Sequence, residues 1–237
     1  MSMGVFVNYA HRGASHYLPE NTMLAFYAGI YMGANGIETD VQLSADGIPV
    51  LFHDDTLTRV TGQSGSVGDY TWQQLQSFCV TKNAFTDKIV TLEDFLQHFA
   101  FRDITFAIEL KGAGVEKATA DLLRKYNLEN KAVVTSFSLE YLENFRSLAP
   151  EFQIGYLTEA IHEALLLHLQ QLHCEELCPE AQCVTPESVQ HWHSLGFRVR
   201  AWGVYDESLM AHAYACGVDG MTVNFPDKLT SLIDATH

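Results

Sequence analysis

The fold class is decided by the stretch from 104 to 158, which reads ITFAIELK (104–111), VEKATADLLRKY (115–126), AVVTSF (132–137), SLEYLENFRSLA (138–149) and FQIGYLT (152–158). Three apolar runs of strand length alternate here with two amphipathic runs of helix length. Strands that alternate with helices in this way are joined by right-handed crossovers and lie parallel in one sheet. The stretch therefore predicts consecutive β-α units of an α/β protein.

The same alternation continues in both directions along the chain. Towards the N-terminus we expect strands and helices at 5–10, 20–34, 36–43, 48–53 and 91–100, and towards the C-terminus at 159–172, 176–184, 185–196, 197–204, 206–217, 219–224 and 226–235. Roughly eight β-then-α units without a break in composition predict one (β/α)8 barrel domain over 1–237. An open doubly wound sheet is the alternative, but its first strand usually leads into a glycine-rich phosphate loop. Here the first strand leads into His-Arg-Gly (11–13).

One stretch interrupts the alternation after the second strand region. Residues 54–90 include TGQSGSVGDYTWQQLQSF (61–78), which is rich in Gly and Ser and holds one short helical piece after Thr71. Such a composition is typical of loops and turns. We therefore expect 54–90 to form a small insertion in the barrel.

Composition excludes several classes of partner. The formal net charge is −15, from 14 basic and 29 acidic residues, so we expect no binding to nucleic acid or to anionic membranes. We expect no signal peptide and no membrane span, because no apolar run approaches the ~18 residues that a span needs. The five cysteines, three of them at 174, 178 and 183, lack the CxxC pairs of a structural zinc site and predict reduced thiols in a cytoplasmic protein. The oligomeric state stays open, with a homodimer as one candidate.

Polar residues stand at four places where apolar runs end: His11-Arg12, Glu38-x-Asp40, His53-Asp54 and Glu109-x-Lys111. Each place alone has an ordinary explanation, such as a salt-bridged pair or a turn. In a barrel of this kind, however, the active site lies at the carboxyl ends of the strands. The coincidence of all four with expected strand ends therefore predicts one shared site.

The carboxylates among these residues predict a metal site. Positions two apart on a strand share a face, so Glu38 and Asp40 point the same way. Neighbouring carboxylates repel each other unless a proton or a cation lies between them. Together with Glu109 they offer an all-oxygen set, which suits Mg²⁺ or Ca²⁺ better than Zn²⁺.

The remaining residues complete the parts needed for cleavage of a phosphodiester. Arg12 and Lys111 are placed to hold an anionic group, and His11 and His53 are suited to proton transfer near neutral pH. A metal and two cations would offset the charge on the phosphoryl oxygens. The residues therefore predict a metal-dependent phosphodiesterase.

Longer motifs carry a resemblance to a known family. HRG (11–13), PENT (19–22), E-x-D (38–40), HD (53–54) and L-x-R-x-T (57–61) follow one another, and IELKG (108–112), TSF (135–137), AWGV (201–204) and GVDGMTVNFPD (217–227) come later. In order and spacing the chain strongly resembles the glycerophosphodiester phosphodiesterase family over nearly its whole length. Asn224 stands where that family often has Asp, and Val90 where it usually has Pro; neither change affects the expected ligands.

The resemblance implies a TIM barrel and the roles of most site residues. It implies one divalent metal ion, Mg²⁺ or Ca²⁺ with Mn²⁺ as a further candidate, and an insertion at 54–90 that shapes the glycerol-binding mouth. It implies Glu38, Asp40 and Glu109 as metal ligands, His11 and His53 as the general acid/base pair, and Arg12 and Lys111 on the phosphate. Trp202, at the end of the seventh strand, is expected either to pack against the substrate or to pack within the barrel mouth.

Two further residues, close in sequence to the proposed site residues, are expected to have supporting roles. We expect Asp54 to orient a neighbour or to form a turn rather than to bind the metal. We expect Asn21 to cap the helix that starts beside it, with a contact to His11 or to a ligand as the alternative.

The expected reaction is hydrolysis of glycerophosphodiesters to sn-glycerol 3-phosphate and an alcohol. A glycosidase would not need an HR pair together with an HD pair, and a phosphatidylinositol-cleaving enzyme would need an apolar ridge that the sequence lacks. A non-catalytic binding protein would be expected to lack one or more of the polar residues. Three matters stay open: the alcohol, which histidine is the base, and whether water or the glycerol 2-hydroxyl attacks first.

Overall fold

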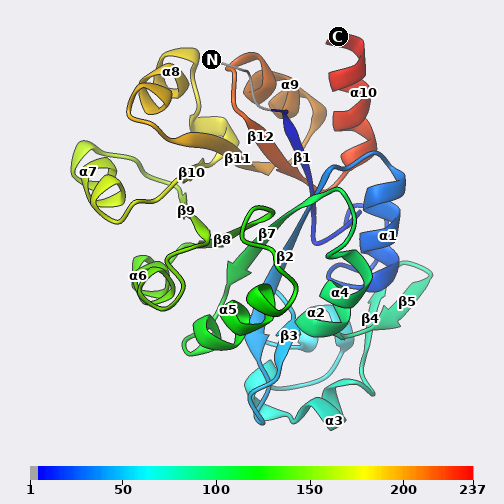
Figure 1. Ribbon diagram of the computed structural model, residues 1–237. Helices are drawn as coiled ribbons and strands as arrows, with labels where there is room; N and C mark the ends of the chain where they lie inside the picture. The colour runs from blue at the N-terminus through cyan, green and yellow to red at the C-terminus, as the bar shows by residue number, and fades with distance from the viewer. Residues whose placement is uncertain (1–4, 237) are drawn as a thin grey trace.

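The computed structural model describes residues 5–236, and its strands close into a barrel (Figure 1). Eight parallel strands of the described chain follow the order β1-β2-β7-β8-β9-β10-β11-β12, and β12 pairs with β1 to close the ring. The predicted (β/α)8 TIM barrel is therefore confirmed. Its strands are β1 (Val7–His11), β2 (Gly36–Leu43), β7 (Thr105–Leu110), β8 (Ala132–Ser136), β9 (Gln153–Thr158), β10 (Glu176–Pro179), β11 (Arg198–Val204) and β12 (Gly220–Val223).

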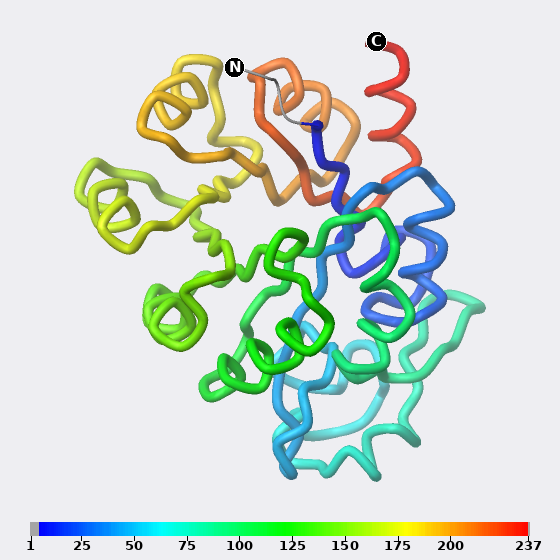
Figure 2. Tube along the Cα trace, in the orientation of Figure 1, coloured from blue at the N-terminus to red at the C-terminus, as the bar shows by residue number. Residues whose placement is uncertain are grey.

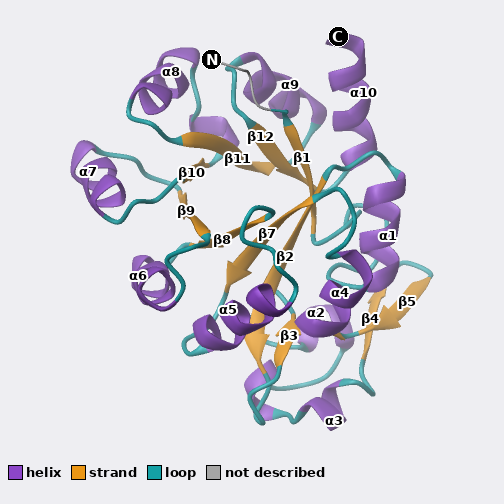
Figure 3. Cartoon of the chain, in the orientation of Figure 1, coloured by secondary structure: helices purple, strands orange, loops and turns teal. Residues whose placement is uncertain are grey.

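Helices surround the strands on the outside, as Figure 3 shows by the purple ring around the orange centre. They are α1 (Met23–Tyr31), α4 (Leu92–Phe99), α5 (Val115–Lys125), α6 (Leu139–Leu148), α7 (Glu163–Gln171), α8 (Pro186–Ser194), α9 (Glu207–Ala215) and α10 (Pro226–Thr236). Most begin one to four residues later than the sequence predicts. The reason is that Ser138, Thr185 and Asp206 act as N-caps, whose side chains accept a hydrogen bond from the first turn.

Residues 49–91 form an extension of the barrel at its edge, below α1 in Figure 2. It contains β3 (Pro49–Leu51), α2 (Thr58–Thr61), α3 (Trp72–Leu75), β6 (Val90–Thr91) and a hairpin that the sequence did not predict, β4 (Cys79–Lys82) with β5 (Phe85–Lys88). A short 3-10 helix spans Val67–Asp69. The extension has its own apolar cluster, which includes Val50, Phe52, Leu57, Val67 and Leu75.

The strand expected at 48–53 exists as β3, but it is not a strand of the barrel. It runs antiparallel along the outer part of β2, with Val41 opposite Leu51 and Leu43 opposite Pro49. The prediction that every polar pair follows a barrel strand is therefore wrong for His53. The chain instead turns back along β2, and this return brings His53 to the same end of the barrel.

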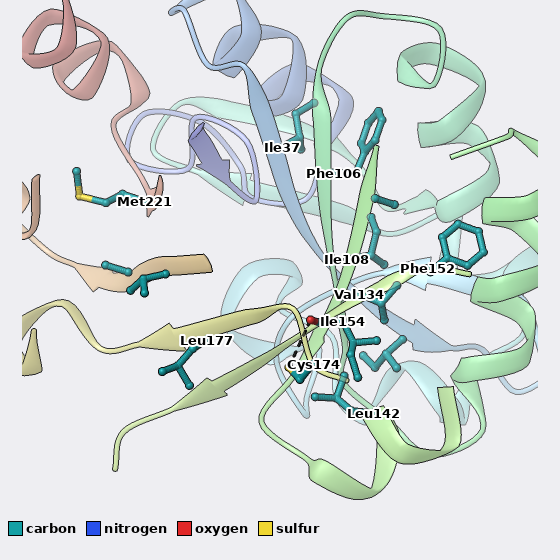
Figure 4. Packing of buried hydrophobic residues seen from close by; sticks show 14 of the residues in the cluster. Ile37, Phe106, Ile108, Val134, Leu142, Phe152, Ile154, Cys174, Leu177 and Met221 are labelled. Carbon is teal, nitrogen blue, oxygen red and sulfur yellow. Dashed lines mark hydrogen bonds between the residues drawn. The ribbon is translucent and has the colours of Figure 1, made fainter. Parts of the chain in front are cut away.

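The main core lies between the strands and the helices. Ile37, Phe106, Ile108, Val134 and Ile154 belong to it, and Figure 4 shows them with residues such as Leu142 and Phe152. Strand side chains alternate between the two faces of the sheet, so the neighbours of these residues face the barrel interior. A small interior cluster of Val7, Tyr9, Ala107 and Val133 packs there. Among the described helices, none has the length and apolar character needed to cross a bilayer.

Candidate active site

Strand register assembles the predicted residues at one end of the barrel. His11 on β1 lies opposite Glu38 on β2, and Asp40 on β2 lies opposite Glu109 on β7. A pocket of about 290 Å³ opens at this end of the barrel. Of the predicted site residues, His11, Arg12, Glu38, His53, Glu109 and Trp202 line it.

The other four predicted residues contact members of this set. Lys111 pairs with Glu109, with Nζ 3.1 Å from Oε1, and Asp54 lies 2.7 Å from His53 Nδ1. Asn21 donates from its amide to Asp40 Oδ2 at 2.9 Å, and Asp40 itself is fully buried. All ten predicted residues therefore lie within one connected group.

Glu38, Asp40 and Glu109 form a buried carboxylate cluster that fits a divalent cation. Each offers an oxygen, and these three oxygens lie within 4.8 Å of one another. Asp40 Oδ1 is buried without a hydrogen-bond partner. A buried polar atom without a partner carries a large desolvation cost, which a bound cation would offset.

The proton affinities of the cluster reflect its crowding. Burial, together with the charges of Asp40 and Glu109, raises the pKa of Glu38 well above its usual value. Burial and the charge of Asp40 raise the pKa of Glu109 to about 7. Burial alone would also raise the pKa of Asp40, but Arg12, His53 and Lys111 outweigh it and lower that pKa. Without a cation, the crowding therefore favours the protonated forms of Glu38 and Glu109.

His11 is held as a neutral ring. Desolvation and the neighbouring charge of Arg12 lower its pKa to about 3, so the ring carries no charge at pH 7. Its Nδ1 lies 2.6 Å from Asn224 Oδ1, which also accepts from the Ser15 hydroxyl at 2.9 Å. An oxygen can only accept, so Nδ1 carries the proton and donates it. Nε2 is left unprotonated, 3.8 Å from Glu38 Oε2.

His53 is held by the turn that follows β3. The Gln42 side-chain amide donates to the carbonyl oxygens of Phe52 and Asp54 at 3.0 and 2.9 Å, which fixes the backbone on both sides of His53. His53 Nδ1 donates to Asp54 Oδ1 at 2.7 Å. This contact leaves Nε2 as the free ring nitrogen of a residue that lines the pocket.

Arg12 lies between the carboxylate cluster and Glu20. Its Nη1 is 3.0 Å from Glu20 Oε1, and its Nε is 3.1 Å from Asp40 Oδ2. The second contact is an ion pair without hydrogen-bond geometry, because the buried Nε has no hydrogen-bond partner. Arg12 therefore keeps an unused donor beside the carboxylate cluster.

The backbone around Arg12 is strained in a way that serves the site. Arg12 and Asn21 adopt left-handed φ values of 56° and 55°, which cost free energy for residues with a side chain. Gly13, with φ of 81°, has no space for a side chain, because a Cβ would lie 2.4 Å from the carbonyl carbon of Ala25. The predicted capping role of Asn21 is wrong: Thr22 caps α1, because its hydroxyl is in place to accept from Ala25 N, whereas the left-handed turn points Asn21 to Asp40.

Aromatic residues at the ends of β8 and β11 form part of the pocket mouth. Trp202 Nε1 donates to the Cys178 carbonyl oxygen at 3.0 Å, and its ring meets the Phe137 ring edge-on at 5.0 Å between centroids. Phe137 and Tyr205 are exposed and also line the pocket. Trp202 thus packs within the mouth and still presents its ring to the pocket.

Sequence reasoning missed three residues that hold this site together. Asn224 orients His11, Glu20 pairs with Arg12, and Arg59 pairs with Glu20 and Asp54. Each belongs to a motif noted above, namely TVNFPD, PENT and L-x-R-x-T, so the signal was present without an assigned role. The pair of Glu176 with Arg200 inside the barrel had no motif to mark it.

Comparisons with known proteins agree over nearly the whole chain. Residues 11–228 match the model of the glycerophosphoryl diester phosphodiesterase family. A glycerophosphodiester phosphodiesterase of Caldanaerobacter subterraneus subsp. tengcongensis is 31% identical, with 94% of this chain and 96% of the relative covered. One of Bacillus altitudinis is 32% identical with the same coverage, 94% and 96%. The structure of an Oleispira antarctica phosphodiesterase in complex with the product sn-glycerol-3-phosphate is similar, with a TM-score of 0.83, 28% identity, and 95% of this chain and 96% of that chain covered.

Proposed function

This chain belongs to the glycerophosphoryl diester phosphodiesterase family and is a glycerophosphodiester phosphodiesterase, and we propose that it acts with a divalent metal ion and two histidines. The reaction proposed is hydrolysis of a glycerophosphodiester to sn-glycerol 3-phosphate and an alcohol. One observation carries the proposal: a cluster of three buried carboxylates, two of which line the pocket, lies beside two histidines that line the same pocket and whose Nδ1 positions are fixed.

Glu38, Asp40 and Glu109 would hold the metal ion. Their oxygen-only set supports Mg²⁺ or Ca²⁺, with Mn²⁺ as a further candidate. When bound, such an ion supplies positive charge that offsets the negative charge developing on the phosphoryl oxygens. The unpartnered Asp40 Oδ1 supports this assignment independently of the family resemblance.

Arg12 and Lys111 would hold the phosphate of the substrate. Arg12 lines the pocket, with its Nη1 on Glu20 and its buried Nε beside Asp40, so Nη2 would be the nitrogen that donates to a phosphate oxygen. Lys111 lies beside Glu109, which places a second positive charge next to the carboxylate cluster. Hydrogen bonds that strengthen as charge develops on these oxygens would lower the reaction barrier.

The two histidines would divide the proton transfers. His11 starts neutral with Nε2 unprotonated, which suits a base that accepts a proton from the nucleophile. His53 would act as the acid in its doubly protonated form: Nε2 first takes up a proton from solvent, the Asp54 carboxylate on Nδ1 stabilises the resulting imidazolium, and Nε2 then gives that proton to the departing alcohol oxygen. If the glycerol 2-hydroxyl attacks first to give a cyclic phosphate, the same two residues would exchange roles when water opens the ring.

A glycerol 3-phosphate release assay tests this proposal. The panel of glycerophosphodiesters would differ in the alcohol, and Mg²⁺, Ca²⁺ and Mn²⁺ would be varied after dialysis against EDTA. We expect loss of activity after EDTA, and a decrease in kcat of about 10²–10⁴-fold in His11→Ala or His53→Ala with metal binding retained. His168→Ala, which changes an exposed histidine paired with Glu143 on the outside of the barrel, serves as the matched control. Full activity in His53→Ala, or activity that survives complete removal of metal, would contradict the proposal.

A substrate with a better leaving group separates the two histidine roles. p-Nitrophenol leaves without needing a proton, so a p-nitrophenyl diester should lower the penalty of His53→Ala but not that of His11→Ala. The reverse pattern would assign the roles the other way round. The oligomeric state, with a homodimer as one candidate, is to be tested by sedimentation, and the predicted cytoplasmic location by cell fractionation.

A further inference from the structure

An unbroken series of alternating charges connects His53 with the carboxylate cluster. We call it the ion-pair chain, and it consists of Asp54, Arg59, Glu20, Arg12 and Asp40 in that order. Neighbouring charged atoms are 2.5 Å apart for Asp54 and Arg59, 2.7 Å for Arg59 and Glu20, 3.0 Å for Glu20 and Arg12, and 3.1 Å for Arg12 and Asp40. It therefore runs from Asp54, the partner of a histidine proposed to transfer a proton, to Asp40, a residue proposed to hold the metal.

Arg59 is the second member of the ion-pair chain and joins Asp54 to Glu20. Its Nε and Nη2 lie 2.5 and 2.9 Å from the two oxygens of Asp54, and its Nη1 and Nη2 lie 2.9 and 2.7 Å from the two oxygens of Glu20. One guanidinium thus binds two carboxylates in forked geometry, which a lysine cannot reproduce. The two carboxylates come from different segments, the turn after β3 and the segment before α1.

The two carboxylates that Arg59 binds are the partners of two proposed active-site residues. Asp54 accepts from His53 Nδ1, and Glu20 accepts from Arg12 Nη1. The hydrogen bond from Arg59, with a smaller one from His53, lowers the pKa of Asp54 to about 2. Burial would raise the pKa of Glu20, but Arg59 and Arg12 outweigh it. Both carboxylates are therefore charged and committed to defined partners at neutral pH.

Arg59 also supplies the positive charge between groups that would otherwise attract a cation. Glu20, His53 and Asp54 each offer an atom, and these atoms lie within 4.8 Å of one another. The Arg59 guanidinium contacts both carboxylates of this group. Without it, Glu20 and Asp54 would repel each other or bind a second cation, and either event would move His53 and Arg12.

From these contacts we infer that Arg59 is a positioning residue for the reaction. It holds His53 through Asp54 and Arg12 through Glu20, and so sets the distance between proton transfer and phosphate binding. The neighbouring Leu57 is fully buried in the apolar cluster of the extension, which anchors the start of α2 that carries Arg59. The inference rests on the proposed function, since it assigns Arg59 to the residues proposed there.

A double-mutant cycle with kinetic measurements tests the inference. Arg59→Met keeps an unbranched side chain as far as the position of Nε but removes the guanidinium and with it both ion pairs, and we expect kcat/KM to fall by about 10–100-fold. Both kcat and KM should change, because His53 and Arg12 are both released. Asp54→Asn should cause a loss that does not add to that of Arg59→Met, since the two changes break the same contact. Arg59→Lys should restore part of kcat.

The control is Arg124→Met on α5, far from the site. Arg124 is likewise a half-exposed arginine that bridges two acidic residues, Asp121 and Glu151. It should leave kcat and KM unchanged, and the melting temperatures of both methionine variants should be compared. Kinetics of Arg59→Met equal to those of Arg124→Met, or losses that add fully to those of Asp54→Asn, would overturn the inference.

A second readout does not depend on activity. The ¹⁵N signals of the His53 ring, assigned by their absence in His53→Ala, should show one tautomer with Nδ1 protonated in the unchanged protein. In Arg59→Met they should shift towards a mixture of tautomers, and in Arg124→Met they should not move. Unchanged His53 signals in Arg59→Met would overturn the inference even if the substrate proved to be a different diester. Absence of glycerol 3-phosphate release by the unchanged protein would instead count against the proposed function.

Discussion

Two groups of buried charges face the inside of this barrel, and they differ in how their charge is balanced. On one side, Glu38, Asp40 and Glu109 crowd together and leave Asp40 Oδ1 without a partner. On the other side, Glu176 Oε1 accepts from Arg200 Nε at 2.6 Å. Arg200 also donates to Thr222 Oγ1 at 2.6 Å and lies over the Tyr9 ring, 5.1 Å from its centroid.

The difference separates the carboxylates proposed to hold a metal from a pair whose charges are balanced within the fold. A buried pair whose donors and acceptors are satisfied is stable by itself and needs nothing from solution. A buried group of like charges is costly until a cation joins it. Breaking each side should therefore have opposite consequences for stability and for activity, and the predictions below test that contrast.

The largest effect is expected on activity when the crowded side loses a carboxylate. Glu38→Gln keeps the shape of the side chain but removes one of the charges proposed to hold the metal, so activity should fall by roughly 10³-fold. The metal-free protein should be at least as stable as before, because the raised pKa already favours a neutral Glu38 there and the amide of Gln is neutral at every pH. Glycerol 3-phosphate release and urea unfolding would measure the two effects. A stable variant with full activity would contradict the proposed role of Glu38 as a metal ligand.

The balanced side should respond in the opposite way. Glu176→Gln leaves the buried Arg200 charge without a counter-charge, which should cost about 3–5 kcal/mol of unfolding free energy. Urea unfolding measures this cost, and Glu151→Gln, at an exposed pair with Arg124, should cost no more than about 1 kcal/mol. Residual folded protein should still bind metal. Equal costs for the two substitutions would refute the assigned difference between the sides.

The pH dependence of metal binding sharpens the contrast further. Glu109 has a pKa of about 7 without a cation, so metal must displace a proton below that pH. Below pH 7 the affinity for the metal should rise about tenfold per pH unit for each proton displaced. Above pH 7 the contribution of Glu109 to this rise should end, because Glu109 is then already ionised. The metal-free protein should lose stability as pH rises from 4.5 to 7, because the folded state holds a proton that the unfolded state has released. Calorimetry in buffers of different ionisation enthalpy would count the protons, and Glu109→Gln should reduce that count.

The smallest effect is expected at the pocket mouth above the balanced side. Trp202→Phe keeps an aromatic ring but loses the hydrogen bond to the Cys178 carbonyl. We expect KM to rise a few-fold, about 1 kcal/mol or less of binding free energy, with kcat almost unchanged. A large decrease in kcat with constant KM would show that this side takes part in the chemistry.

The sequence predicted the barrel well because each unit carries its own local signal. Alternating runs located every barrel strand and every outer helix, with errors of a few residues where caps such as Ser138 begin a helix. The sequence-based prediction failed at the extension, where the segment of β3 was expected to end at the active site as a barrel strand does, but β3 runs antiparallel to β2. Direction within a sheet depends on which strand a segment pairs with, and a short apolar run does not specify that partner.

The candidate site shows the same division. The sequence by itself determined which residues are proposed to carry the chemistry, because strand periodicity puts Glu38 and Asp40 on one face and because motif order marks the histidines and cations. Only the tertiary structure decided the contacts between them: Asn224 on His11, Asn21 on Asp40, and Arg59 between Asp54 and Glu20. Asn224 and His11 come from opposite ends of the chain, and barrel closure brings them together. The other contacts join residues 5 to 39 positions apart, and the left-handed turn at Asn21 and the return of the chain along β2 set their geometry. Contacts between side chains that are not related by the repeat of a helix or strand produce no periodic pattern in a single sequence.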